Sequence, residues 1–506
     1  MNHKLYSEIK NNSFPLNIKD VPVLKYDVFY ELVCDSLIDE AKHCFNYYCI
    51  ESSGILKCFC CIADDNNNSI YVFSHELNKD YPVLKSLTQA CLQLHIFERE
   101  IHENYGVEFE GHPWLKPVRY PQDRPDKSQI ISNYPFYSIE SEELHEVGVG
   151  PIHAGVIEPG YFRFICNGEK VLHLEIQLGY QHRGIEKLLI EKSTPLQRCI
   201  LSENIAGDTS VGHSLAHSQL IESLAGIEVS EALQIERCIA LELERLAVNI
   251  GDTAALCGDV AYQLGQVVCE ALRTTIINTT QLWCGNRFGK GLVRPGGSNY
   301  PLNEKIAEEI QRVLTDSVRR FCEIADRIYS LPSVLVRFED IGRVSKLQML
   351  DIGAMGMAAR SCGIERDIRK THPFQYFRNY SVNPVTIATG DVYARGMLRN
   401  LESRESVKII LRLIEIWKQK NNNAEKPVYN YKLKPDSFGI SVIEGWRGEI
   451  CHIAITDNNG DIIHYKVKDP SMQNWMALAL SVRNQEISDF PICNKSFNLS
   501  YCGNDL

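Results

Sequence analysis

Paired thiolates are the first feature of this sequence that could do chemistry, because two cysteines in C-x-x-C spacing can hold one metal ion. Cys58 and Cys61 have this spacing, with Cys60 between them. No second pair of this kind occurs, so the metal-binding prediction is weak. The 18 cysteines of the 506-residue chain are otherwise scattered, and we expect reduced thiols that are mostly buried as small apolar side chains.

Three common ligand-binding motifs are incomplete or absent. A dinucleotide fingerprint G-x-G-x-x-G begins at Gly148 and Gly150 but lacks its third glycine. A phosphate loop ending at Gly289-Lys290 would need a glycine at Cys284 and a hydroxyl residue at Gly291. No H-E-x-x-H segment is present. The chain therefore carries no local signature for NAD, ATP or catalytic zinc.

Composition and charge indicate what must position such residues. The chain is 44% hydrophobic and 23% charged, as in ordinary globular proteins, and its length suggests two to four folding units. A formal charge of −11 makes nucleic acid an unexpected partner. No stretch approaches the roughly 18 apolar residues of a spanning helix, and the first residues lack the apolar core of a secretion signal, so we expect no direct membrane insertion.

The pattern of elements favours an α+β protein. Residues 1–120 are predicted to form a small α/β domain, with a strand at 70–73 and a helix over 84–105 that Gly106 ends. Residues 121–141 form a predicted linker, rich in Pro, Asp and Ser. Residues 142–506 are predicted to form the second domain.

Helices dominate the middle of this second domain. Two apolar stripes at helical spacing predict long helices that need each other or further helices as partners, which indicates a bundle rather than a doubly wound sheet. The stripes are Ile235, Ile239, Leu243, Leu246 and Ile250, and Ile310, Leu314, Val318, Phe321, Ala325 and Ile328. Near the C-terminus, 451–456 and 461–468 are predicted strands of a hairpin, in which Asn459-Gly460 supplies the positive φ angles of a tight turn. This hairpin would bring 444–449 beside 469–474.

Two long segments make the sequence specific, Val149–Gly160 and Leu174–Leu188. They resemble the large subunit of group 4 membrane-bound [NiFe] hydrogenases, the hydrogenase-4 and formate hydrogenlyase type, which is related to the large quinone-module subunit of complex I. Further marks of this family follow in order, at Arg287-Phe288, Pro295-Gly-Gly297, 367–370, 389–395 and 444–449. Residues 97–101 and 106–113 resemble the smaller hydrophilic subunit of the same module, so the chain resembles a fusion of the two subunits.

The resemblance implies four cysteine ligands for nickel and iron, and the chain has none of them. The first ligand segment corresponds to 203–209, which places Ala206 and Thr209 at ligand positions. The second corresponds to 469–474, which places Ser471 and Asn474 there. Alanine has no donor atom, and hydroxyl and amide groups are poor ligands for soft metals, so we predict that no [NiFe] centre assembles.

Charged neighbours of that site persist. By resemblance, Glu186 lies at the place of a second metal, Arg447 beside the diatomic ligands of iron, and Asp469 at the start of the second ligand segment. These groups are expected either to pair with one another in a cleft or to serve a proton or quinone path.

Quinone is one candidate ligand, because complex I uses the corresponding cavity for it. The headgroup tyrosine of complex I would fall near Ala206, and only one of its two hairpin histidines has a counterpart, His153. His182 and His213 also lie in family motifs, where structural and catalytic roles both stay open.

The catalytic candidates are therefore His153, Glu186, Arg447 and Asp469. We expect a hydrophilic subunit of a complex I-like or hydrogenase-4-like oxidoreductase that couples electron transfer, from NADH or another donor to a quinone-like acceptor, to ion translocation. The resemblance implies an iron–sulfur small subunit and antiporter-like membrane subunits as partners, no cofactor bound by this chain itself, and a place on the cytoplasmic face of the membrane. The alternatives are a non-redox scaffold that transmits conformational change and a hydrogenase with unusual ligands.

Overall fold

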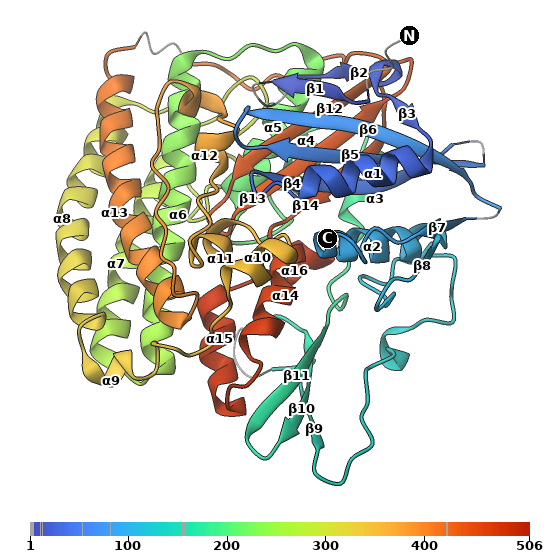
Figure 1. The fold of residues 1–506 in the computed structure, drawn as a ribbon. Coiled ribbons are helices and arrows are strands. Elements are labelled where there is room, and N and C mark those ends of the chain that lie inside the picture. The colour runs from blue at the N-terminus through green and yellow to red at the C-terminus, as the bar shows by residue number, and fades with distance from the viewer. Residues whose placement is uncertain are drawn as a thin grey trace.

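The computed structural model describes residues 5–506 except 11, 13, 53, 81, 154–156 and 421–423. The start of the chain and the centre of the 149–160 motif, both used above, therefore lie partly outside the described residues. Sheets occupy one side of the molecule and long helices the other, and a three-stranded sheet projects at one end (Figure 1). The architecture is α+β, as predicted.

The N-terminal region is a sheet with two helices. The strands are β1 (Ser7–Lys10), β3 (Val23–Leu24), β4 (Lys42–Ser52), β5 (Ile55–Asp64) and β6 (Ser69–Asn78). They run in the order β1-β6-β5-β4, with β3 parallel to β6. Helices α1 (Tyr26–Leu37) and α2 (His95–Tyr105) pack on this sheet, and a small parallel pair, β7 (Val83–Lys85) and β8 (Glu108–Glu110), lies beside α2.

Strands β4 and β5 are buried on both faces, which explains their unbroken apolar runs. Phe29 of α1 and Phe97 of α2 belong to the core on one face of the sheet. On the other face, Phe59 of β5 stacks on Phe438 of a second sheet. The small cysteine side chains of these strands fill both cores, as expected of buried thiols.

The structure corrects the helix predicted over residues 84–105. Residues 83–85 form β7, and α2 begins only at His95, after a single turn of 3₁₀-helix over Leu92–Leu94. Leu84 instead pairs with Phe109 of β8. The predicted end is correct, because Gly106 caps α2 with φ +72°.

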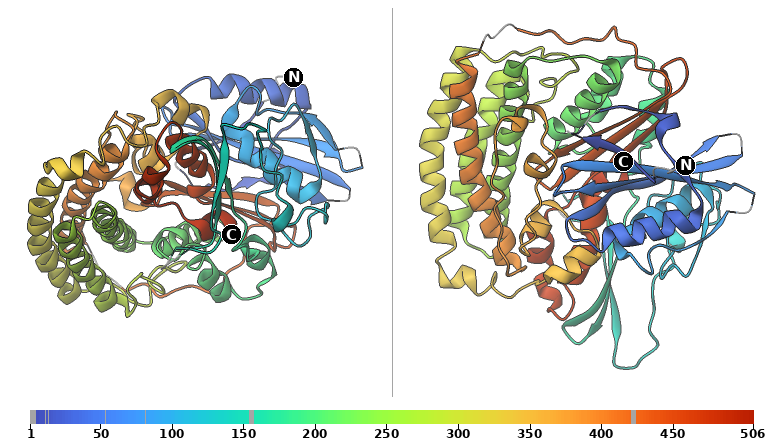
Figure 2. Two further views of the ribbon diagram at one scale, coloured as in Figure 1. Left: turned by 90° about the horizontal axis from the view of Figure 1, so that it is seen from below. Right: turned by 45° about the horizontal axis from the view of Figure 1, so that its top comes forward.

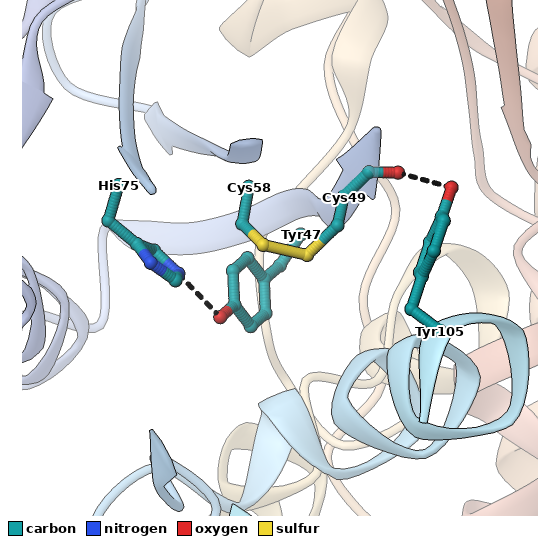
Figure 3. Close-up of a disulfide and its surroundings, with 5 residues drawn as sticks. All are labelled: Tyr47, Cys49, Cys58, His75 and Tyr105. Atoms are coloured by element: carbon teal, nitrogen blue, oxygen red, sulfur yellow. Dashed lines mark hydrogen bonds between the residues drawn. A yellow bond between two sulfur atoms is a disulfide. The ribbon is translucent and has the colours of Figure 1, made fainter. Parts of the chain in front are cut away.

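The prediction that the cysteines are reduced thiols is wrong for two of them. Cys49 and Cys58 lie opposite each other on β4 and β5 and form a disulfide (Figure 3). Cys58 and Cys61 belong to the cores on opposite faces of the sheet, because residues three apart in a strand point to opposite sides. They cannot bind one metal ion together.

The segment after the N-terminal region leads into the projecting sheet. Its strands are β9 (His145–Val149), β10 (Tyr161–Asn167) and β11 (Lys170–Gln177), paired antiparallel in the order β11-β10-β9. Within the predicted linker 121–141, the described regular structure is one turn of 3₁₀-helix at Ile131–Asn133. The predicted domain boundaries themselves stay predictions.

The bundle is built on α6 (Glu231–Asp259), α7 (Gln263–Cys284), α8 (Glu304–Ile328) and α13 (Val392–Trp417), which stand side by side (Figures 1 and 2). Both predicted stripes are confirmed as α6 and α8, and each packs on α7 and α13. Shorter helices surround them: α3 (Ile185–Glu191), α4 (Pro195–Ser202), α5 (Ser210–Ala225), α9 (Pro332–Leu335), α10 (Lys346–Asp351), α11 (Gly356–Arg360), α12 (Ile368–Thr371), α14 (Ser471–Ser481), α15 (Phe490–Phe497) and α16 (Tyr501–Asp505). In the described part of the chain, no helix is long and apolar enough to cross a membrane.

The C-terminal sheet lies between the N-terminal sheet and α5. Its strands are β12 (Ser437–Glu444), β13 (Glu449–Thr456) and β14 (Ile462–Lys468), and the short β2 (Leu16–Asn17) pairs with β12. The predicted hairpin forms as β13 and β14, but its turn differs. Gly460 has φ +85°, Asn459 does not enter this region, and the Asp457 carboxylate holds the five-residue loop by accepting from the backbone of Asn459 and Asp461.

A buried carboxyl in the bundle gives a pH prediction. Burial raises the pKa of Glu236 on α6 to about 7, although its oxygens accept from Leu302 N and Trp417 Nε1. The folded state keeps this proton up to about pH 7, while the unfolded chain releases it near 4.5, so stability falls as the pH rises through this window. We expect Glu236→Gln to reduce the loss of unfolding free energy between pH 5 and 8 by roughly 3 kcal/mol. Urea unfolding at both pH values measures it, with Glu231→Gln on the exposed face of α6 as the control that should leave the pH dependence unchanged.

Candidate functional site

Arg447 is at the centre of a polar site between the end of β12 and the start of α5. Its guanidinium, almost fully buried, forms a two-pronged ion pair with Asp208, with N···O distances of 2.7 and 2.6 Å. It also donates to the backbone oxygen of Asn498. Burial alone would lower the pKa of Arg447, but Asp208 raises it above the usual value, so the side chain stays charged.

Asp469 faces the same site from the segment between β14 and α14. One of its oxygens accepts from Ser471 N at 2.8 Å, and the other lies 3.1 Å from His213 Nε2. Burial opposes its ionisation, but the hydrogen bond from His213 and the charges of His213 and Arg447 outweigh it and hold the pKa of Asp469 below its usual value. Asp469 is thus an anion in a site with no solvent access of its own.

The four positions predicted to have lost metal ligands are all buried. Thr209 Oγ1 donates to Asp208 and accepts from Arg447. Ser471 Oγ accepts from Ser500 N at 2.9 Å. The Asn474 amide accepts from Met355 N and donates to Met355 O. The polar side chains at these positions are therefore hydrogen-bonded to the protein itself, and Ala206 contributes a methyl group.

The remaining catalytic candidates lie apart from this cluster. Glu186 on α3 accepts from Val467 N at 2.9 Å and forms an ion pair with Lys466 at 3.0 Å. His153 lies 2.8 Å from the backbone oxygen of Gly160. The predicted charged residues do not pair directly with one another, since Glu186 binds Lys466 and Arg447 binds Asp208.

A chain of buried hydrogen bonds leads away from Asp469. His213 Nδ1 lies 3.1 Å from His452 Nε2, and His452 Nδ1 lies 2.9 Å from the Tyr465 hydroxyl. The same hydroxyl lies 2.8 Å from His217 Nδ1. Burial holds the pKa of His217 at about 3 and that of His452 well below its usual value, so both rings are neutral at pH 7. Neutral imidazoles can pass a proton along such a chain by exchanging tautomers.

Sequence reasoning missed most of this chain. His213 was noticed only as part of a motif. His213 and His217 stand four residues apart, so they share one helix face, and this spacing was the available signal. His452 and Tyr465 lie on the paired strands β13 and β14, where only the register of the hairpin shows that they face α5. Among the described residues, no group of three or more His, Cys, Asp and Glu side chains could hold a metal ion.

Comparison with known families identifies two regions. The model described as "Respiratory-chain NADH dehydrogenase, 30 Kd subunit" matches residues 23–129, and the one described as "Respiratory-chain NADH dehydrogenase, 49 Kd subunit" matches residues 259–439. The chain is therefore a fused 30 kDa and 49 kDa subunit of the family that complex I shares with the group 4 hydrogenases.

Individual relatives come from both branches of this family. Hydrogenase-4 component G of Escherichia coli is 25% identical over 427 residues, which cover 81% of this chain and 73% of the relative. Formate hydrogenlyase subunit 5 of the same organism is 26% identical over 85% of this chain and 78% of the relative. The C/D fusion protein of the NADH-quinone oxidoreductase of Phocaeicola vulgatus is 26% identical over 85% of this chain and 88% of the relative.

Proposed function

We propose that this chain is the large hydrophilic subunit of a membrane-associated oxidoreductase and works without a nickel–iron centre. In this role it helps to couple electron transfer, from NADH or another donor to a quinone-like acceptor, to ion translocation. The observation that carries the proposal is the set of side chains at the four family ligand positions, none of which is a thiolate and all of which are buried.

The donor set does not fit nickel and iron. Both metals in such a centre need thiolate sulfur, and bridging sulfurs hold them together. Ala206 has no donor atom, while Thr209, Ser471 and Asn474 offer neutral oxygens that already take part in protein hydrogen bonds. A metal ion would have to break these bonds and gain only weak ligands. We therefore assign no step of the function to such a centre.

The polar groups around those positions give the site its chemistry. Arg447 supplies a permanent positive charge, and Asp469 is the anionic end of the chain that runs through His213, His452 and Tyr465 to His217. We propose that this chain moves or stores a proton when the neighbouring redox centre changes charge. The redox centre itself would belong to an iron–sulfur partner, and the ion path to antiporter-like membrane subunits, on the cytoplasmic face of the membrane.

Purification from membranes without oxygen or crosslinker tests this function. We expect an integral-membrane partner to copurify and nickel to stay far below one atom per chain. A Ser471→Cys variant should behave in the same way, because three of the four thiolates would still be missing. Stoichiometric nickel in the native chain would contradict the metal-free site, and a chain that emerges without any membrane partner would contradict the assembly.

A further inference from the structure

A large cavity lies outside the polar site, between the N-terminal region and the rest of the molecule. Its volume is about 840 Å³, which falls in the range of about 300–1,000 Å³ of sites for small organic molecules. The walls come from α2, the segment 113–118, the linker at 134–137, strand β11 and helix α14. None of the four catalytic candidates lines it.

The walls are mostly apolar and aromatic but include two buried polar groups without a partner. The His95 side chain is almost fully buried, and neither of its ring nitrogens has a hydrogen-bond partner within the described residues. The same holds for Trp475 Nε1. A buried polar group left without a partner costs about 1–3 kcal/mol, so these two groups indicate a bound partner.

Positive charge gathers along the same walls. Arg99 donates to the backbone oxygens of Lys116 and Pro117, and in the described structure neither Arg99 nor Arg483 has an ion-pair partner. Lys116 pairs with Glu175, the single carboxylate among the described lining residues, so that pair is neutral. Two uncompensated guanidinium groups therefore remain at an apolar cavity.

We propose that this cavity binds a small, ring-containing organic anion. The apolar body of the ligand would pack against the aromatic and aliphatic walls, and an oxygen of the ligand would accept from Trp475 Nε1. The anionic group would pair with Arg99 or Arg483, which are suited to carboxylate, sulfonate and phosphate groups. Burial, together with the charge of Arg99, keeps the pKa of His95 well below its usual value, so its ring is neutral and offers one donor and one acceptor.

The cavity also borders the polar site. Met472 lines the cavity and follows Ser471 at the start of α14. Arg119 Nη2 lies 3.6 Å from Met472 Sδ and Arg119 Nε donates to Asn504 O, and Asn504 also lines the cavity. A ligand in the cavity would thus contact the helix whose first residues face Asp469.

Two fluorescent probes test the proposal on the purified full chain. The first is 8-anilinonaphthalene-1-sulfonate, an aromatic anion, and the second is N-phenyl-1-naphthylamine, its neutral analogue. We expect one saturable site per chain for the anion. Ala479→Trp should fill the cavity and raise the Kd at least tenfold, with Leu480→Trp as a second filling variant. Val267→Trp, on the exposed face of α7 and far from the lining residues, is the matched control.

Arg483→Gln separates charge from shape. We expect it to raise the Kd of the anionic probe several-fold and to leave that of the neutral probe unchanged. Equal binding in Ala479→Trp and Val267→Trp would overturn the cavity as the site, and equal changes for both probes would overturn the preference for an anion. If the isolated chain binds the anion but the intact membrane complex does not, a partner subunit fills the cavity, and the proposal also fails.

Discussion

Replacing Arg360 with methionine should lower the free energy of unfolding by about 3–5 kcal/mol, because it leaves buried carboxylates without their cation. The Arg360 side chain has no exposed area and lies 2.8 Å from both Glu402 and Glu444. Asp367 lies 3.9 Å away on the other side. Methionine fills a similar volume but can neither neutralise nor hydrogen-bond these oxygens.

Arg360 belongs to a buried ion network between α6, α13 and the 360s segment. Its three cations are Arg245, Arg360 and Arg369, and its four acids are Glu242, Asp367, Glu402 and Glu444. Burial and the charge of Asp367 raise the pKa of Glu444 to about 7, so the fourth acid holds a proton near neutral pH. The network then contains equal numbers of positive and negative charges.

Urea unfolding at pH 6 measures the effect, with two comparison variants. Arg312→Met removes an exposed arginine that pairs with Glu309 on α8, and we expect a change below about 1 kcal/mol. Glu444→Gln should cost less than Arg360→Met at this pH, because it replaces a group that is already uncharged. Equal costs for Arg360→Met and Arg312→Met would show that the network contributes nothing to stability.

The sequence predicted those parts of the fold in which one face of an element differs from the other. Helices α6 and α8 carry apolar stripes and were found. Helix α5 is buried all round, between the C-terminal sheet and other helices, so no stripe marks it. Residues 83–85 look helical by their apolar content, but pairing with β8 makes them a strand. The disulfide depends on strand register, which places Cys49 opposite Cys58.

The candidate site shows the same limit. The resemblance indicated Arg447 and Asp469, and the structure brings both to one place. Their partners Asp208 and His213 are more than 230 residues away in the sequence, so only the fold joins them. Glu186 was predicted beside them, but its partner Lys466 alternates with inward-facing residues on β14 and carries no motif. Local patterns identify which residues are unusual, while ion pairing is a property of the packed chain.

The second large effect concerns the contact between the N-terminal region and the C-terminal sheet. Glu449 on β13 forms an ion pair with Lys468 on β14, and its other oxygen lies 2.8 Å from His43 Nε2 on β4. All three side chains are almost fully buried. Burial opposes ionisation of Glu449, but Lys468 and His43 hold its pKa well below the usual value.

We expect Glu449→Gln to cost about 3–5 kcal/mol of unfolding free energy, since it leaves the Lys468 ammonium buried without a carboxylate. Lys468→Met should cost a similar amount, because Glu449 then keeps only His43. The double variant should cost clearly less than the sum of the two, with a coupling energy of at least about 2 kcal/mol, because removing both charges leaves no uncompensated ion.

A matched exposed pair provides the control for this cycle. Lys79 and Glu51 lie 2.6 Å apart at the surface of the N-terminal region, and their side chains are 42% and 40% exposed. We expect the same cycle there to give less than about 1 kcal/mol, because water screens the pair. If the two cycles gave equal coupling, desolvation would not govern the contact at Glu449. The N-terminal region would then be held by the apolar stacking of residues such as Phe59 on Phe438, and its charged residues would not determine how it docks.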